Sequence, residues 1–386
     1  MFPLRAALLF CAPMLVNGIG LPYFPVFLEY LHMSDAEIGI ILAMPHLVRM
    51  VGTPLGALLA DRARDRSTIL IWSGAISLVT ALILFFTHSF WAVLFVFSLQ
   101  GLFYAPYLPV AEAVLLTGVR RWGYDYGSMR LWGSVAFVFA TMMGGTLFDL
   151  YGARMVLPSM AAFFVLTIIV AVFAPRLGTS RVAPIAGAAP APVLANPLLR
   201  PDFLLVLIGA SIINGSHGML FGFASIYWTG QGFTGHQIGI FWTAGVVAEI
   251  GMFYYARRLT ARFSIWKLLL TGGFVTLLRW LLFSMPMGFY GHLLLQCTHA
   301  FSFALVHVSI QRFMIDRAPE RHEASAQGLY TTFTALFNAA TAFGSGLIYQ
   351  RYGVDGFNAM AVFVVFGLLS IVFAQALQPQ RLRSGG

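Results

Sequence analysis

Residues 145–152 read Gly-Thr-Leu-Phe-Asp-Leu-Tyr-Gly, and residues 346–353 read Gly-Leu-Ile-Tyr-Gln-Arg-Tyr-Gly. The two segments share their first glycine and their final Tyr-Gly pair. Shortly after each copy, Met-Ala-Ala-Phe at 160–163 is echoed by Met-Ala-Val-Phe at 360–363. Each copy also separates one long apolar run from the next. We interpret the pattern as an internal repeat, in which two similar halves of the chain follow each other in the same orientation.

The apolar runs around these segments are long enough to cross a membrane, which takes about 20 residues per helix. Hydrophobic residues make up 59% of the 386-residue chain and charged residues only 10%, against about 25% charged in soluble domains. A soluble enzyme with a solvated surface is therefore excluded. The runs are 5–30, 37–60, 68–87, 90–118, 129–149, 154–175, 202–228, 236–256, 265–285, 289–315, 324–349 and 355–377.

These runs form two groups of six, separated by a stretch at 176–201 that is rich in proline, glycine and alanine. We therefore predict an all-α membrane protein with twelve transmembrane helices in two parallel six-helix bundles, at 1–175 and 202–386. Residues 176–201 would be a cytoplasmic linker between them. Pro106 and Pro109 lie deep in the fourth run, where each removes an intrahelical hydrogen bond, so this helix should bend or open there.

The positive charges predict the orientation in the membrane. Seventeen Lys and Arg residues at the termini and in the connections would lie on one side, and only Arg154 and Arg351 fall on the other. The positive-inside rule then places both termini in the cytoplasm, and we expect a monomer in a bacterial inner membrane. The basic residues are spread over short connections and form no single solvated patch, so a nucleic-acid partner is not expected.

Ionisable residues inside the apolar runs are the candidates for function, because a charge at mid-helix costs about 3 kcal/mol. They must pair with one another or face water. We expect Arg312 to reach the membrane surface, Arg49 either to brace helices or to act in transport, and His217 and His307 to be packing residues. The remaining candidates come from five different runs in both halves and are expected to line a shared cavity: Glu112, Arg130, Glu249, Arg279 and His299.

The sequence predicts neither a cofactor nor a bound metal. Within the apolar runs there is no His-x-x-x-His or Glu-x-x-His pair, the spacings that would place two metal ligands on one helix face. The Gly144-Gly145 pair is not followed by the Lys-Ser/Thr of a nucleotide-binding loop. With no room for a soluble catalytic domain, we expect a transporter of a small molecule rather than an enzyme. An integral membrane enzyme is the alternative from a different class.

Several stretches carry a family resemblance. The first is Asp-Tyr-Gly-Ser-Met-Arg-Leu-Trp-Gly-Ser at 125–134. It resembles the phenylpropionate-permease group of the major facilitator superfamily, a neighbour of the lactose permease branch, and the likeness covers essentially the whole chain. The further matching stretches are Gly-Phe-Ala-Ser-Ile-Tyr-Trp at 222–228, Gly-Val-Val-Ala-Glu at 245–249, Leu-Arg-Trp at 278–280 and Gln-Cys-Thr-His at 296–299.

The resemblance implies roles at matching positions. Glu112 and Arg130 match the substrate-binding glutamate and arginine of lactose permease. Glu249, Arg279 and His299 match its glutamate, arginine and histidine on the eighth, ninth and tenth helices, and we count these three as substrate-binding too. The permease has a proton-carrying glutamate three residues after the histidine, where this chain has Ser302. We therefore expect proton coupling either to be lost or to use Glu249, assisted by His299.

The substrate class stays open at this stage. A small aromatic carboxylate would suit Arg130 as a planar anion clamp, with Trp132 among the rings that would hold its aromatic part. A sugar or nucleoside would instead hydrogen-bond to Glu112 and stack on a ring, and drug efflux is a further alternative. After the second run, Asp61-Arg62 keeps part of a superfamily signature. Asp61 and Arg62 would form either an inner gate or a loop whose charges only set the orientation in the membrane.

The orientation can be tested by labelling single cysteines from outside the cell. Positions in 87–89 and 229–235 should react with a membrane-impermeant reagent, whereas positions in 62–67 should not, because the positive-inside rule places 62–67 in the cytoplasm. The opposite labelling pattern would disprove the orientation.

Overall fold

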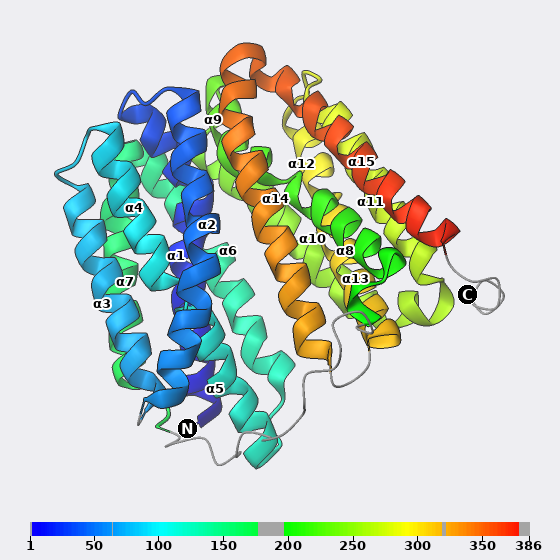
Figure 1. Ribbon diagram of the computed structural model, residues 1–386. Helices are drawn as coiled ribbons and strands as arrows, with labels where there is room; N and C mark the ends of the chain where they lie inside the picture. The colour runs from blue at the N-terminus through cyan, green and yellow to red at the C-terminus, as the bar shows by residue number, and fades with distance from the viewer. Residues whose placement is uncertain (1, 64, 177–196, 319–321, 378–386) are drawn as a thin grey trace. The chain divides into compact units, whose positions relative to one another are not determined.

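The computed structural model describes residues 2–63, 65–176, 197–318 and 322–377 (Figure 1). Within these ranges the chain is helical and contains no β-strand, as the apolar runs predict. The helices of the first half are α1 (Phe2–Tyr30), α2 (Asp35–Arg62), α3 (Arg66–Leu84), α4 (Phe90–Tyr104), α5 (Tyr107–Trp122), α6 (Tyr126–Tyr151) and α7 (Val156–Val172).

In the described part of the second half there are eight further α-helices and one short π-helix. The π-helix, Ala300–Leu305, lies between α12 and α13. The α-helices are α8 (Pro201–Gly215), α9 (Gly218–Gly230), α10 (Gly235–Arg262), α11 (Ile265–Phe283), α12 (Phe289–Cys297), α13 (Val306–Arg317), α14 (Glu323–Tyr352) and α15 (Phe357–Ala376).

Eleven helical stretches of the described residues are long and apolar enough to cross a membrane. The last of them, Ser325–Ala376, contains both α14 and α15, separated by a turn at Gly353–Gly356. Counted separately, these two helices bring the number of spans to the predicted twelve. Residues 177–196 lie outside the described part of the chain, so the linker at 176–201 and the domain boundaries beside it stay predictions.

The predicted break in the fourth span is confirmed. Helix α4 ends at Tyr104 and α5 begins at Tyr107, so that Pro106 stands between them. A Cβ atom added to Gly56 of α2 would overlap the ring of Pro106, so only a glycine lets α2 approach this break so closely. Two more spans are interrupted: the seventh between α8 and α9, and the tenth at the π-helix.

The repeated Tyr-Gly pairs have the same structural role in both halves. Gly152 follows the last residue of α6 with φ +75°, and Gly353 follows the last residue of α14 with φ +54°. Residues with a Cβ atom rarely adopt such φ angles, whereas glycine adopts them freely. The sequence repeat therefore marks two matching helix-to-helix corners.

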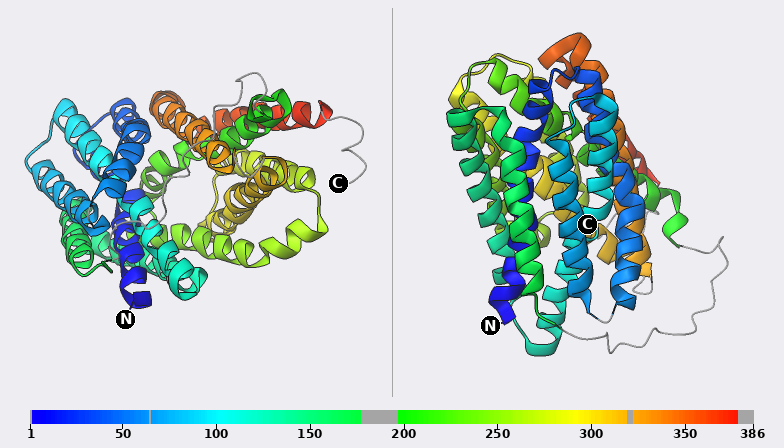
Figure 2. Two further views of the ribbon diagram at one scale, coloured as in Figure 1. Left: turned by 60° about the horizontal axis from the view of Figure 1, so that its bottom comes forward. Right: turned by 90° about the vertical axis from the view of Figure 1, so that its left-hand side faces the viewer.

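Helices α1 to α7 form a compact unit together with residues Phe221–Thr243 of α9 and α10. Within it, α1 packs against α6 and α7 (Figure 2). A Cβ atom on Gly18 of α1 would lie 2.6 Å from the Phe137 carbonyl oxygen of α6. The Thr141 hydroxyl donates to the Gly18 carbonyl at 2.9 Å. Small residues thus bring α1 and α6 into backbone contact, as is typical of membrane helices.

The second compact unit contains α8, the start of α9, the rest of α10, and α11 to α15. Its α8 and α15 approach each other in a similar way, because a Cβ atom on Gly209 would lie 2.7 Å from the Gly367 carbonyl oxygen. Helix α11 packs against α15 and against the π-helix. At the second contact, Gly272 faces the carbonyl oxygen of Phe301, 3.1 Å from where a Cβ atom would stand.

Asp149, inside the first copy of the repeat, caps the N-terminus of α10. Its Oδ1 accepts from the backbone N–H of Gly235 at 2.6 Å, and its Oδ2 accepts from that of His236 at 2.9 Å. Beside it, a Cβ atom on Gly235 would lie 2.6 Å from the Gly145 carbonyl oxygen. The Tyr23 hydroxyl bonds to the Gly235 carbonyl at 3.2 Å. A carboxylate is favourable here because a helix N-terminus carries partial positive charge.

Replacing Asp149 by asparagine should lower the free energy of unfolding by about 1 kcal/mol, because the charge and one acceptor oxygen are lost at the helix N-terminus. Thermal unfolding in detergent would measure the change. The matched control is Asp355→Asn, since Asp355 is exposed and its side chain forms no hydrogen bond or ion pair among the described residues. Equal melting temperatures for the two variants would contradict the capping role.

Candidate functional site

The first turn of α6 places Tyr126 and Arg130 on one helix face, because they are four residues apart. Asp125 begins the helix, and its Oδ2 accepts from the Ser128 N–H at 2.7 Å. The Tyr126 hydroxyl donates to the carboxylate of Glu112, which comes from the end of the fourth span on α5. Glu112 is half-buried. The structure thus brings Glu112 to α6, but its hydrogen-bond partner there is Tyr126 and not Arg130.

The guanidinium of Arg130 lies against two aromatic rings. Its Cζ is 5.7 Å from the centre of the Phe10 ring and 6.0 Å from that of Tyr126, within the range of cation–π attraction. Gly133, one turn further along α6, leaves the space that Phe10 occupies. Arg130 is exposed and, among the described residues, pairs with no carboxylate. Its N–H donors therefore remain available to a ligand.

Trp132 does not join this group. It is 58% exposed and stands two positions after Arg130, so the two side chains leave α6 in different directions. Its role in holding a substrate ring stays a prediction.

A second cluster, in the other compact unit, is centred on Arg279 of α11. This side chain is 1% exposed. Its Nη1 donates to Nδ1 of His299 at 2.9 Å and to the Ser302 hydroxyl at 2.9 Å. Its Nη2 donates to Oε1 of Gln296 at 2.8 Å. Four neutral or aromatic groups therefore surround it, counting the Trp280 ring, whose centre is 5.1 Å from Cζ.

The hydrogen bonds of Arg279 fix the proton positions on His299. An arginine only donates, so Nδ1 of His299 must accept, and in the neutral ring the proton is then on Nε2. That Nε2 faces Glu249 of α10, 3.7 Å from its Oε2. His299 therefore lies between Arg279 and Glu249, the two residues to which the family resemblance assigns roles beside it.

Ser302 continues the cluster to His217, which lies in the break between α8 and α9. The two side chains are 3.1 Å apart at Ser302 Oγ and His217 Nε2, and Nδ1 of His217 lies 3.0 Å from the Asn214 carbonyl. Since a carbonyl only accepts, Nδ1 carries the proton and Nε2 accepts from the serine. His217 is fully buried.

Sequence reasoning did not single out Tyr126 or Gln296, and it noted Ser302 only as a missing acid. A signal was present, because Gln296, His299 and Ser302 are spaced by three residues and so would share a helix face. The role of Tyr126 depends on how α5 meets α6, which spacing along one helix does not reveal.

Arg312 and Arg62 form no hydrogen bond or ion pair with either cluster in the described part of the chain. Arg312 pairs with Asp316 one turn away at 3.1 Å, in line with a structural role. Arg62 ends α2 and is exposed, but the side chain of Asp61 lies outside the described part. The acid seen with an arginine near this loop is Asp65, whose Oδ2 is 3.7 Å from Nε of Arg176 and whose Oδ1 caps α3.

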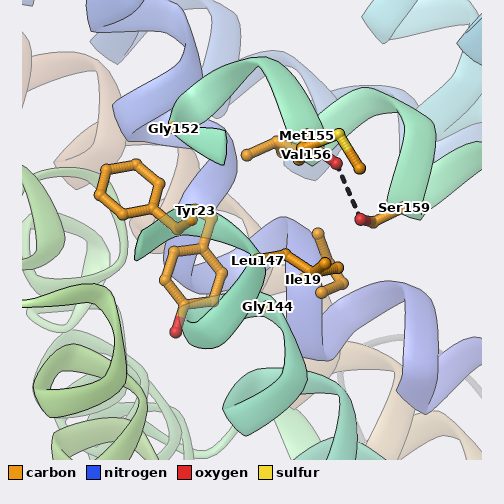
Figure 3. A pocket seen from close by; sticks show the side chains of 9 residues that line it. Ile19, Tyr23, Gly144, Leu147, Gly152, Met155, Val156 and Ser159 are labelled. Carbon is orange, nitrogen blue, oxygen red and sulfur yellow. Dashed lines mark hydrogen bonds between the residues drawn. The ribbon is translucent and has the colours of Figure 1, made fainter. Parts of the chain in front are cut away.

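A small cavity in the first unit is a separate feature (Figure 3). It holds about 180 Å³ of space between α1, α6 and α7 that is partly open to the surroundings, and Ile19, Tyr23 and Leu147 are among its lining residues. No group of three or more His, Cys, Asp and Glu within the described ranges would hold a metal ion.

Comparison with known proteins gives relatives along the whole chain. A "Probable 3-phenylpropionic acid transporter" of Escherichia coli is 27% identical over 356 residues, covering 89% of this chain and 90% of the relative. A "Maltose permease" of Geobacillus stearothermophilus is 25% identical over 375 residues, covering 96% and 91%. These relatives are transporters, which supports that class over a membrane enzyme.

Solved structures share the fold at lower identity. The nucleoside transporter NupG superposes with a TM-score of 0.78 at 16% identity, covering 97% of this chain and 98% of NupG. The model of the MFS_1 like family matches residues 8–364. This chain therefore belongs to the MFS_1 like family and is a multi-pass secondary transporter of the major facilitator type.

Proposed function

We propose that this transporter carries a small aromatic carboxylate into the cell together with a proton. The observation that carries the proposal is the state of Arg130, an exposed arginine held against two aromatic rings with no acid among its described partners. A planar guanidinium binds a carboxylate through two parallel hydrogen bonds. The ring of Tyr126, which is only partly buried, would pack against an aromatic group attached to that carboxylate.

The named relatives support two substrate classes. The name of the Escherichia coli relative indicates an aromatic carboxylate, which agrees with the chemistry around Arg130. The maltose permease indicates a sugar. A sugar would use Glu112 as an acceptor for its hydroxyls, but one oxygen of that carboxylate already accepts from Tyr126. We therefore place the carboxylate first and the sugar second.

Proton coupling is assigned to Glu249, with His299 as its assistant. Adding a proton to Nδ1 of His299 would break the hydrogen bond from Arg279, whereas adding one to the Glu249 carboxylate leaves that bond intact. Arg279 itself keeps its proton under all physiological conditions. Glu249 is therefore the proton carrier, and His299 presents its Nε2–H to it. Together with a monocarboxylate, one proton makes the transported pair electrically neutral.

The proposal extends to the setting of the protein. Both termini lie in the cytoplasm of a bacterium, the chain crosses the inner membrane as a monomer, and Asp61 with Arg62 forms a cytoplasmic gate. The asymmetry of the arginines supports the orientation. Uptake of radiolabelled 3-phenylpropionate into proteoliposomes, with maltose as the alternative solute, tests the substrate class directly. Uptake of maltose alone would reverse the order of the two candidates.

Arg130→Lys should weaken binding of 3-phenylpropionate by about tenfold, because lysine keeps the charge but loses the planar fork. Calorimetric titration of the purified protein would measure the affinity. Arg312→Lys is the matched control, since Arg312 pairs with Asp316 away from both clusters. Unchanged affinity in the Arg130 variant would rule out the clamp.

Glu249→Gln should abolish uptake driven by a pH gradient but still permit exchange of substrate across the liposome membrane, because glutamine cannot carry a proton. Glu29→Gln serves as the control: Glu29 is exposed near the end of α1, and this variant should retain both activities. If the Glu249 variant still concentrates substrate when only a pH gradient is imposed, another group carries the proton.

A further inference from the structure

Tyr126 contacts both charged residues of the first cluster, one through its hydroxyl and the other through its ring. We propose that Tyr126 sets the preference for anionic substrates by keeping the Glu112 carboxylate engaged and so leaving Arg130 unpaired. This inference rests on the proposed function and adds to it a residue that determines selectivity. Tyr126 acts as a positioning residue, through Glu112 and Arg130.

The geometry separates the two charges. The hydroxyl of Tyr126 donates to Glu112, which projects from α5. The guanidinium of Arg130 lies over the same tyrosine ring, with Cζ 6.0 Å from its centre. No hydrogen bond or ion pair joins Glu112 to Arg130 in the described structure. Tyr126 therefore touches both residues, while the acid and the base do not pair with each other.

Pairing would be the expected alternative without the hydroxyl. Opposite charges attract strongly where water is scarce, and a glutamate bound to Arg130 would occupy the planar fork that a substrate carboxylate needs. It would also repel that carboxylate. The aromatic rings have the opposite effect, because they attract the guanidinium through its flat face and leave the N–H edge open. Tyr126 thus holds Arg130 in place without neutralising it.

The consequence is selectivity for charge. An acid gains from an unpaired Arg130, whereas a neutral ligand of the same shape gains little. When Tyr126 loses its hydroxyl, Glu112 becomes free to pair with Arg130, and the acid should lose affinity while the neutral ligand does not. The effect should also depend on Glu112, because glutamine at this position carries no charge to compete for the arginine.

The test is a double-mutant cycle with two probes, 3-phenylpropionate and its neutral amide 3-phenylpropanamide, titrated into the purified full-length protein. Tyr126→Phe should weaken binding of the acid by about tenfold and leave the amide unchanged. In the Glu112→Gln background the same substitution should change acid binding by less than about twofold. The reason is that the effect of Tyr126 depends on the charge of Glu112, and a double-mutant cycle measures such coupling between two residues. Tyr124→Phe is the control, because Tyr124 is a nearby tyrosine whose ring stacks on Phe2.

Loss of both ligands to the same extent, or the same loss in both backgrounds, would show a merely structural role and overturn the inference. If the unmodified protein does not prefer the acid to the amide, the proposed function fails. A measurement without ligand then tests separately whether Tyr126 keeps Arg130 unpaired. Modification of Arg130 by phenylglyoxal, followed by mass spectrometry, should be slower in Tyr126→Phe than in the parent protein. In the Glu112→Gln background, Arg130 should be modified equally fast with tyrosine or phenylalanine at position 126. Equal rates in the parent and Tyr126→Phe would overturn the inference.

Discussion

A positive charge buried inside a membrane span must find its partners within the protein, and Arg279 shows what this requirement imposes. Its side chain is 1% exposed, and its two Nη groups donate to a histidine, a serine and a glutamine. Because an arginine can only donate, each partner must present an acceptor. The proton position of His299 follows from that condition, whereas that of His217 follows from its bond to the Asn214 carbonyl, which can only accept. The interrupted helices around the cluster bring these acceptors within reach.

Close helix packing is the second condition. Charged and polar side chains can meet inside a bundle only if the backbones that carry them approach closely, and glycine provides this at several contacts. Gly133 makes room for Phe10 beside Arg130, and Gly272 admits the π-helix next to Arg279. In both cases the glycine belongs to the helix that bears the arginine. Gly272 also faces the helical turn that bears the partners of Arg279.

The sequence predicted the number of spans, the repeat and the break at Pro106, because these depend on local hydrophobicity and on proline and glycine chemistry. It also singled out Glu112, Arg130, Glu249, Arg279 and His299 as candidates, because charges in apolar runs are costly. Apart from the spacing of Gln296, His299 and Ser302, it held no signal for the partners of these residues. The Tyr126–Glu112 hydrogen bond depends on how α5 and α6 pack together. The cluster at Arg279 depends on a π-helix, which no pattern in the sequence predicts.

That π-helix has a consequence for comparing this chain with its relatives. A π turn closes its hydrogen bond over one residue more than an α turn does, so it behaves as a single-residue insertion within a helix. Residues before Ala300 and after Leu305 are therefore out of register with a regular helix by one position. Ser302, where lactose permease has an acid, lies within this segment. An alignment without gaps to a relative whose tenth span is a regular α-helix would then pair side chains that occupy different places in space.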